Sequence, residues 1–288
     1  VYLFGASPAM CSSFLQGREP KYKFQALGKG SLYLPYATSL RMSDLGYTNS
    51  AQSSLNISYN NLPDYIKGLR QAISTPSAEY ASIGTKVDGE YQQLNSNILQ
   101  IENEFYSSIR PKRTTERGET ALQALRLRGV EYVEVRCVDL NPYEPLGITK
   151  TQMQVMDAFL LYCLLSDSPQ TDEREFYQGQ ENQKRIVNSG RDPALRLQRG
   201  DQEVLMRDWA AEILQGSMAA ADLLDQAKGG SAHQQALSLQ QAKLADPELT
   251  PSARVLRDMT AAGQSFYAHT LALAEQQRAY FADRPLAA

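Results

Sequence analysis

Glu134 and Arg136 are the residues of this chain whose types and spacing most directly suggest chemistry. They lie two positions apart in the segment 129–139, GVEYVEVRCVD, which reads as a β-strand because it is rich in β-branched and aromatic residues. Side chains two positions apart on a strand project from the same face. A carboxylate beside a guanidinium could hold a metal ion next to a phosphate oxygen. The alternative is a solvated face that carries an ion pair.

The two faces of this predicted strand differ in chemistry. Val130 and Val138 flank the two charged residues, which therefore lie in the middle of the strand rather than at its end. The opposite face is small and apolar and consists of Val133, Val135 and Cys137. We expect that face to contact the hydrophobic core.

Two further segments carry candidate polar groups. A strand predicted at 99–109 alternates with period two, and its polar face holds Glu102, Glu104 and Tyr106; an exposed, solvated sheet would show the same pattern. The loop 37–49 is rich in hydroxyl and amide side chains, and its Arg41 and Tyr47 are suited to binding a carboxylate. The alternative for that loop is an ordinary surface connection.

Composition excludes several classes of function. The net charge is −3 and no Lys/Arg-rich run occurs, so we expect no nucleic-acid partner. The longest apolar run, 158–165, is far shorter than the roughly 20 residues that span a bilayer, and no secretory signal is recognisable. Three widely spaced cysteines favour a reduced, cytoplasmic protein without disulfides. Both histidines occur late in the sequence, and neither Walker nor Rossmann glycine motifs are present.

The coarse pattern predicts an α+β fold. Strands, including one at 31–36, dominate a β-rich part at 1–147, and a helical region at 148–288 packs on it. Caps and apolar periodicity predict helices at 61–74, 120–127, 149–165, 172–188, 201–228, 232–244 and 250–281. On the helix at 149–165 the expected buried stripe is Met153, Met156, Leu160 and Leu164.

Taken together, several segments resemble a known family. They are YLFGASPA at 2–9, LPYATSLRMSDLGYTN at 34–49, QIENEFY at 100–106 with IRPKR at 109–113, and EYVEVR at 131–136. In this order they resemble the glutamate–cysteine ligase family of proteobacterial type. The second half of the chain is similar mainly in length, in Asn141-Pro142 and in TPSARVL at 250–256.

The resemblance implies a fold and a reaction. The family has a glutamine-synthetase-like, mostly antiparallel sheet that forms a funnel-shaped site, with a helical C-terminal region. Its reaction is the first step of glutathione biosynthesis: ATP phosphorylates the γ-carboxylate of L-glutamate, and the amine of L-cysteine attacks the acyl phosphate. Mg²⁺, or Mn²⁺ in its place, neutralises charge on the phosphates.

The resemblance also implies residue roles. Glu134 corresponds to a magnesium ligand, and Arg136 is the expected catalytic residue that contacts the nucleotide's transferred phosphate. Arg41, Tyr47 and Tyr106 are the expected ligands of the cysteine carboxylate. Arg110, Lys112 and Arg113 are weaker candidates for nucleotide contacts. We expect Glu134, Arg136, Arg41, Tyr47 and Tyr106 to share one cleft.

One departure from the family concerns the remaining metal ligands. The chain resembles the family's C-terminal portion without its N-terminal part, where the other metal-binding carboxylates, a histidine ligand and a further phosphate-binding arginine are expected. Since Mg²⁺ needs about six oxygen ligands, a single carboxylate should bind it weakly. We therefore predict that the isolated chain is inactive. Two alternatives are a related carboxylate–amine ligase with another acceptor and a non-catalytic remnant of the family.

Overall fold

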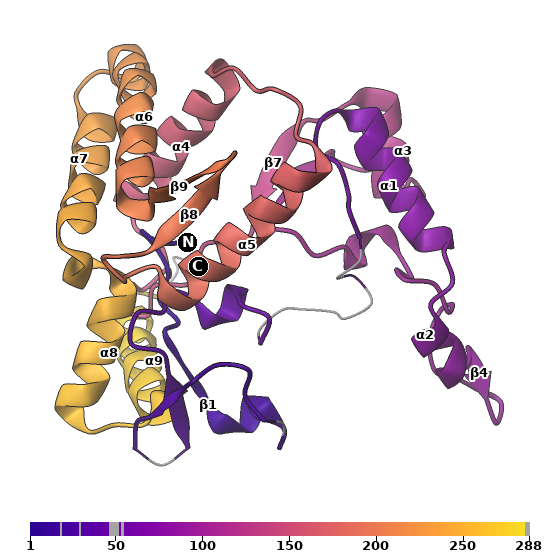
Figure 1. Ribbon diagram of the computed structural model, residues 1–288, viewed down its shortest axis with the longest axis horizontal. Helices are drawn as coiled ribbons and strands as arrows, with labels where there is room; N and C mark the ends of the chain where they lie inside the picture. The colour runs from indigo at the N-terminus through magenta and orange to yellow at the C-terminus, as the bar shows by residue number, and fades with distance from the viewer. Residues whose placement is uncertain (18, 29, 46–51, 53–54, 286–288) are drawn as a thin grey trace. The chain divides into compact units, whose positions relative to one another are not determined.

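The computed structural model describes residues 1–17, 19–28, 30–45, 52 and 55–285. The chain forms two compact units, one made of 1–46 with 138–288 and the other of 47–137 (Figure 1). The boundary expected between 147 and 148 lies inside the first unit, so the predicted division by secondary structure does not coincide with the compact units. In the described part of the chain, no helix combines the length and hydropathy needed to cross a membrane.

The first unit begins with a small antiparallel sheet. Its strands are β1 (Ala9–Cys11), β3 (Ser31–Tyr33) and β2 (Gln25–Ala26), in that spatial order. Met10 lies opposite Leu32 in the register. Both residues contribute to a local apolar cluster that also contains Leu34 and Leu40, which follow β3 in the sequence. The strand predicted at 31–36 is therefore present but shorter.

Six helices make up the described helical part of this unit. They are α4 (Lys150–Leu165), α5 (Glu173–Ser189), α6 (Met206–Lys228), α7 (Ala232–Ala245), α8 (Pro251–Ala262) and α9 (Phe266–Ala282). Thr149 and Asp172 close capping boxes at the starts of α4 and α5, which is why these helices begin where the sequence predicted.

Two of the predicted helices needed correction. The segment 201–228 is not helical from its start, because β8 (Arg196–Arg199) and β9 (Gln202–Leu205) form a hairpin around Gly200 and α6 begins only at Met206. The segment 250–281 is two helices rather than one. Gly263 adopts the left-handed conformation with φ 58° and ends α8, as glycine does at many helix C-termini.

The main core of the first unit lies between α4, α6 and α7, which run side by side (Figure 1). Val155 and Ala158 of α4 pack against apolar residues of α6 and α7. The expected stripe on α4 is wrong at its two ends, because Met153 is 48% exposed and Leu164 is 79% exposed, whereas Met156 packs against this core. The helix has little one-sided hydrophobicity, so the sequence pattern did not fix which face is buried.

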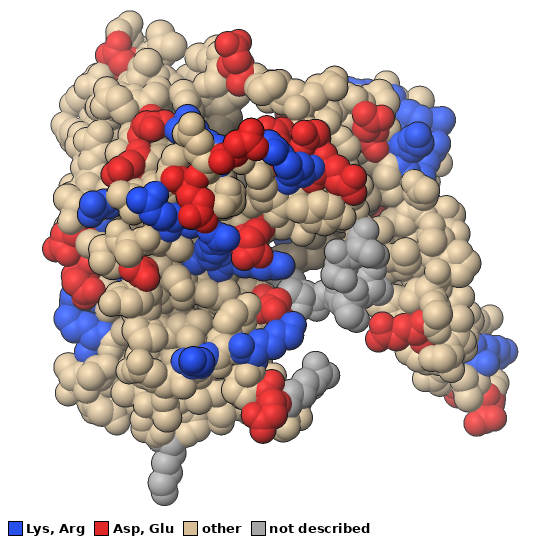
Figure 2. Space-filling model, in the orientation of Figure 1, with Lys and Arg blue, Asp and Glu red and all other residues tan. Residues whose placement is uncertain are grey.

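The outer surface of α5 carries charges of both signs (Figure 2). Arg185 lies 3.7 Å from Glu181 on the same helix and 3.2 Å from Glu203 of β9. Exposed pairs of this kind contribute little to stability because water and salt screen them. They neutralise one another locally, so this face offers no concentrated positive surface.

Lys243 of α7 is a cation within this mostly apolar environment. Its ammonium donates a hydrogen bond to the Leu3 carbonyl oxygen at 3.0 Å and lies 5.1 Å from the centre of the Phe4 ring. Burial lowers the pKa of Lys243 from its ordinary 10.5 to about 8.

This lowered pKa predicts that the chain becomes more stable as the pH rises from about 7.5 to about 9.5. In that window the folded chain releases the Lys243 proton while the unfolded chain keeps it, so the unfolded state binds more protons. The expected contribution is about 2 kcal/mol in the free energy of unfolding. Urea unfolding of the native and Lys243→Met chains at both pH values measures it. Equal pH responses of the two chains would contradict the prediction.

The second unit contains three described helices and two small antiparallel ribbons. The helices are α1 (Leu62–Ser74), α2 (Ala78–Ile83) and α3 (Ala121–Arg128), and the ribbons pair β4 (Lys86–Val87) with β5 (Glu90–Tyr91) and β6 (Ile109–Lys112) with β7 (Tyr132–Val135). Asn61 caps α1 and Thr120 caps α3, so both helices match their predicted positions. Leu99, Leu69 and Leu125 are buried together in the core of this unit.

The strand predicted at 99–109 is wrong for most of its length. Residues Glu102–Glu104 form a 3-10 turn, and β6 begins only at Ile109. The Glu102 carboxylate accepts hydrogen bonds from the Leu122 N–H at 2.8 Å and the Thr120 hydroxyl at 3.0 Å. Glu102 therefore stabilises the start of α3. The solvated face that the sequence allowed for this residue is not what the structure shows.

Candidate active site

The ribbon of β6 and β7 positions the residues on which the predicted chemistry depends. The two strands are antiparallel, with Arg110 opposite Glu134 and Lys112 opposite Tyr132. Directly opposed residues of an antiparallel pair project from the same face. Glu134 therefore lies among cationic side chains of the neighbouring strand.

The Glu134 side chain is partly exposed, but one of its carboxylate oxygens is enclosed. Its side chain is 41% exposed overall, and the Lys112 ammonium lies 3.5 Å from Oε2. Oε2 itself is buried and has no hydrogen-bond partner in the described part of the chain. A buried carboxylate oxygen held only by a neighbouring charge is an available acceptor.

Arg136 lies just beyond β7 and continues the pairing with the segment before β6. Its backbone N–H donates to the Ser108 carbonyl at 2.8 Å, and its guanidinium carbon lies 4.9 Å from the centre of the Tyr106 ring. A guanidinium over an aromatic face is stabilised by the ring's negative charge density. The structure thus brings together Arg136 and Tyr106, two residues to which the resemblance gave separate roles.

Arg110 connects these groups electrostatically. Burial lowers its pKa, the neighbouring positive charge of Arg136 lowers it further, and the Glu134 carboxylate raises it. Its Nη2 donates to the carbonyl oxygens of Asn103 and Phe105. These bonds tie the 103–105 segment to β6, so the Arg110 guanidinium supports the fold. A nucleotide contact stays a prediction for Arg110, Lys112 and Arg113.

The face expected to contact the core is less buried than the sequence predicted. Val133 is 44% exposed, and Val135 and Cys137 are half-buried. The ribbon has two strands, and β7 has four residues instead of the eleven predicted. A two-stranded ribbon offers one neighbour per strand, which leaves much of either face uncovered.

Arg41 lies in the first unit, in the short helical turn Leu40–Met42. Its Nε donates to Oδ1 of Asp139 at 2.6 Å, and its Nη2 donates to the Val138 carbonyl at 3.1 Å. Asp139 is only 3% exposed and also accepts from the Ala6 N–H and from two serine hydroxyls, those of Ser7 and Ser39. This carboxylate fixes the direction in which Arg41 projects.

Asp139 is the positioning residue that sequence reasoning missed. Its partners lie 98 to 133 positions away along the chain, so no local pattern marks the contact. The available signal was indirect: a charged residue directly follows the apolar end of the predicted strand, within the range 129–139.

The predicted site residues fall into three groups. Glu134, Arg136 and Tyr106 lie in the second unit, Arg41 lies in the first, and Tyr47 lies outside the described residues. The structure therefore places Arg136 next to Tyr106, and it places Arg110 near both Glu134 and Arg136. A cleft shared by all five residues stays a prediction.

The described residues could supply one ligand of a metal ion, but they do not form a complete metal site. Among the described residues, no three histidine, cysteine, aspartate or glutamate side chains gather in a group that could hold a metal. Glu134 with its unpartnered Oε2 could supply one oxygen. The Lys112 ammonium at 3.5 Å occupies the same neighbourhood, so a cation at Glu134 would have to displace it.

Comparison with known proteins decides the family. A family model described as glutamate-cysteine ligase matches residues 1–186. The chain belongs to the glutamate–cysteine ligase family. Glutamate–cysteine ligase of Pseudomonas paraeruginosa is 54% identical over 288 residues, covering all of this chain and 54% of the relative. That of Shewanella oneidensis is 50% identical over 285 residues, 99% of this chain and 54% of the relative.

Solved structures agree with this membership of the glutamate–cysteine ligase family. A crystal structure of glutamate–cysteine ligase from Francisella tularensis in complex with AMP matches with a TM-score of 0.81 and 35% identity, covering 98% of this chain and 59% of that one. A bifunctional glutathione synthetase from Pasteurella multocida matches with a TM-score of 0.66, 97% of this chain and 30% of that one; at 21% identity it shows a shared fold only. The chain spans about half the length of the curated relatives it matches.

Proposed function

We propose that this chain forms part of an ATP-dependent ligase that joins the γ-carboxylate of L-glutamate to the amine of L-cysteine. The observation that carries the proposal is 54% identity to a glutamate–cysteine ligase along the whole of the chain. The AMP-bound relative from Francisella tularensis supports a nucleotide as one ligand. The product, γ-glutamylcysteine, places the protein in glutathione biosynthesis, and we propose a cytoplasmic location.

The proposed reaction has two steps. The γ-carboxylate of glutamate attacks the terminal phosphate of ATP and releases ADP, and the amine of cysteine then attacks the acyl phosphate and releases phosphate. Mg²⁺ or Mn²⁺, when bound, offsets the negative charge that gathers on the phosphate oxygens. Such a reaction depends mainly on positioning and electrostatic stabilisation, which suits a site of carboxylate, guanidinium and phenol groups.

The residues of this chain have distinct proposed tasks. Glu134 would offer its Oε2 as one ligand of the metal ion, and Arg136 would bind the phosphate in transfer. Arg41, held by Asp139, would bind the carboxylate of cysteine together with Tyr47 and Tyr106. We further propose that these residues line a glutamine-synthetase-like sheet. The N-terminal part of the family's proteins would supply the other metal ligands.

The proposal is tested with a chimera in which this chain replaces the matching half of the Pseudomonas paraeruginosa ligase. We expect the chimera to form γ-glutamylcysteine and ADP from glutamate, cysteine and ATP, and we expect the isolated 288-residue chain to show no turnover. A single carboxylate cannot hold the metal ion in place, which is the physical reason for the difference. Product is measured by mass spectrometry, and ADP by a coupled assay.

Three controls make the outcome decisive. The native Pseudomonas enzyme shows the activity expected of a correctly joined protein, and thermal unfolding shows whether the chimera is folded. 2-Aminobutyrate and alanine, offered in place of cysteine, reveal a ligase with another acceptor. A folded chimera without ADP release would contradict the proposal and favour a non-catalytic remnant, whereas turnover by the isolated chain would contradict the predicted inactivity.

A further inference from the structure

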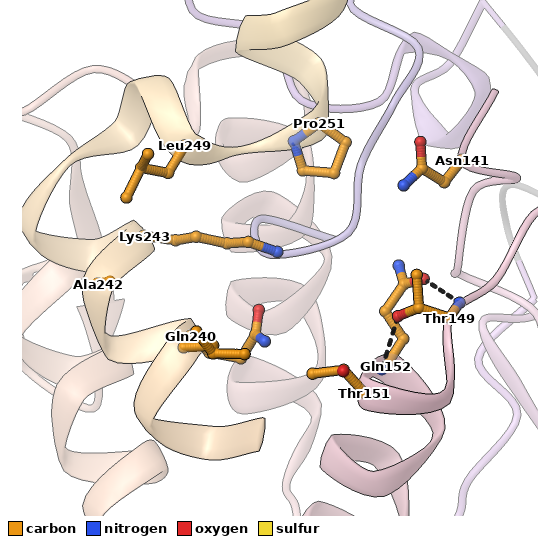
Figure 3. Close-up of a pocket in the computed structure, with 10 residues that line it drawn as sticks. Asn141, Thr149, Thr151, Gln152, Gln240, Ala242, Lys243, Leu249 and Pro251 are labelled. Atoms are coloured by element: carbon orange, nitrogen blue, oxygen red, sulfur yellow. Dashed lines mark hydrogen bonds between the residues drawn. The ribbon is translucent and has the colours of Figure 1, made fainter. Parts of the chain in front are cut away.

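A cavity of about 350 Å³ lies in the first unit between α7, the start of α4 and the start of α8. Most of its wall is apolar and includes Leu239, Leu249 and Pro251. Figure 3 shows Lys243 and Gln240 extending from α7 toward the facing side, where Thr151 and Asn141 lie. Thr149 and Gln152, also on that side, bond each other in the capping box of α4 at 2.8 and 3.0 Å.

Lys243 brings a positive charge to this cavity without a matching carboxylate. Within the described part of the chain, its ammonium makes one hydrogen bond, to the Leu3 carbonyl at 3.0 Å, and an ammonium has three N–H donors. No Asp or Glu oxygen of the described residues forms an ion pair with it; its other neighbour is the Phe4 ring. A partly buried cation with donors to spare favours binding an anion.

Gln240 brings an unpaired acceptor to the same cavity. The residue is only 2% exposed, and its Nε2 donates to the Ala236 carbonyl at 3.1 Å. Its Oε1 is buried and has no partner in the described part of the chain. A buried carbonyl oxygen without a donor is costly, so a ligand that donates a hydrogen bond there gains free energy.

The spacing of these two residues selects the ligand class. Residues three apart on a helix are neighbours on one face, so Lys243 and Gln240 line the cavity from the same face of α7. An α-amino acid carries its carboxylate and its ammonium on the same carbon atom, which matches this arrangement. We propose that the cavity binds a small aliphatic α-amino acid, with its carboxylate on Lys243, its ammonium on Gln240 and its side chain against Leu239, Leu249 and Pro251.

The apolar wall argues against a dicarboxylic amino acid. Among the described residues that line the cavity, Lys243 alone is cationic, so a second carboxylate would be desolvated without a counter-charge. L-Leucine is therefore the probe for the test, and L-glutamate is the comparison ligand expected to bind more weakly. The proposal goes beyond ligase chemistry and does not depend on it.

The test is a calorimetric or NMR titration of the 288-residue chain with L-leucine. We expect saturable binding to one site, weakened about ten- to a hundredfold by Lys243→Met and by Gln240→Met. Gln241→Met and Lys228→Met are matched controls at exposed positions of α7 and α6, and they should leave the affinity unchanged. Circular dichroism verifies that each variant is folded.

Ligand analogues keep the test decisive even if a variant fails to fold. 4-Methylpentanoate lacks the ammonium and 3-methylbutylamine lacks the carboxylate, and each should bind at least about tenfold more weakly than leucine. Three results would overturn the proposal: no binding of leucine up to about 10 mM, equal binding of leucine and 4-methylpentanoate, or unchanged leucine affinity in both folded variants.

Discussion

Replacing Arg136 by lysine in the chimera should lower the turnover number of the ligase by about two to three orders of magnitude. Lysine keeps the positive charge but loses the planar fork that can hold two phosphate oxygens at once. The contact is needed most when charge builds up on the phosphate in transfer, so the loss should appear in kcat more than in KM for ATP. Steady-state assays at varied ATP concentration separate the two constants.

Arg126→Lys is the matched control, because Arg126 is an exposed arginine of the same unit on α3. It should leave kcat unchanged. Tyr106→Phe is an informative companion, since the ring that lies under Arg136 remains and only the hydroxyl is lost. We expect this variant to raise KM for cysteine about tenfold while the ATP constants stay the same. A normal kcat in Arg136→Lys would remove this residue from the proposed phosphate contact.

Local chemistry explains which elements were predictable from the sequence. Thr120, Thr149 and Asp172 each begin a helix at the predicted position, because a capping side chain bonds backbone groups within three residues of itself. The family resemblance, which rests on long ordered matches, was confirmed as well. Such features depend on residues close together in sequence, and a single sequence records them directly.

The errors arose where distant residues decide the structure. The alternation at 99–109 suggested a strand, but Glu102 bonds the start of α3, about 20 positions away, and a turn results. The hairpin of β8 and β9 carries mostly polar residues around Gly200-Asp201, and its turn signal is short beside the long helical pattern that follows. Asp139 is the clearest case, since each of its partners comes from a remote segment.

For the candidate site, the sequence predicted residue types better than surroundings. It placed Glu134 and Arg136 on a strand, and the structure adds Lys112 and Arg110 as their charged neighbours from β6. No periodicity could have shown that Arg110 is buried and bonded to the 103–105 carbonyls. The sequence therefore predicted a carboxylate and a phosphate-binding group. Packing determines which charged side chains surround these two groups.

Replacing Asp139 by alanine should lower the free energy of unfolding of the chain by about 3 to 5 kcal/mol. The carboxylate is almost completely buried, and its loss removes the ion pair with Arg41 and the hydrogen bonds that it accepts from three further donors. Small domains are stable by only about 5 to 15 kcal/mol, so this one change would remove a large fraction of the total. Urea unfolding followed by circular dichroism measures the difference.

Two comparison variants show that the effect belongs to this network. Ser39→Ala removes one donor to Asp139 and should cost about 1 to 2 kcal/mol, whereas Asp157→Ala, at a carboxylate that is 55% exposed and 3.8 Å from Lys228, should cost less than about 1 kcal/mol. In the chimera, Asp139→Asn should also raise KM for cysteine, because an amide cannot hold the Arg41 guanidinium as a carboxylate does. An Asp139→Ala chain as stable as Asp157→Ala would mean that Arg41 is positioned by something other than this buried carboxylate.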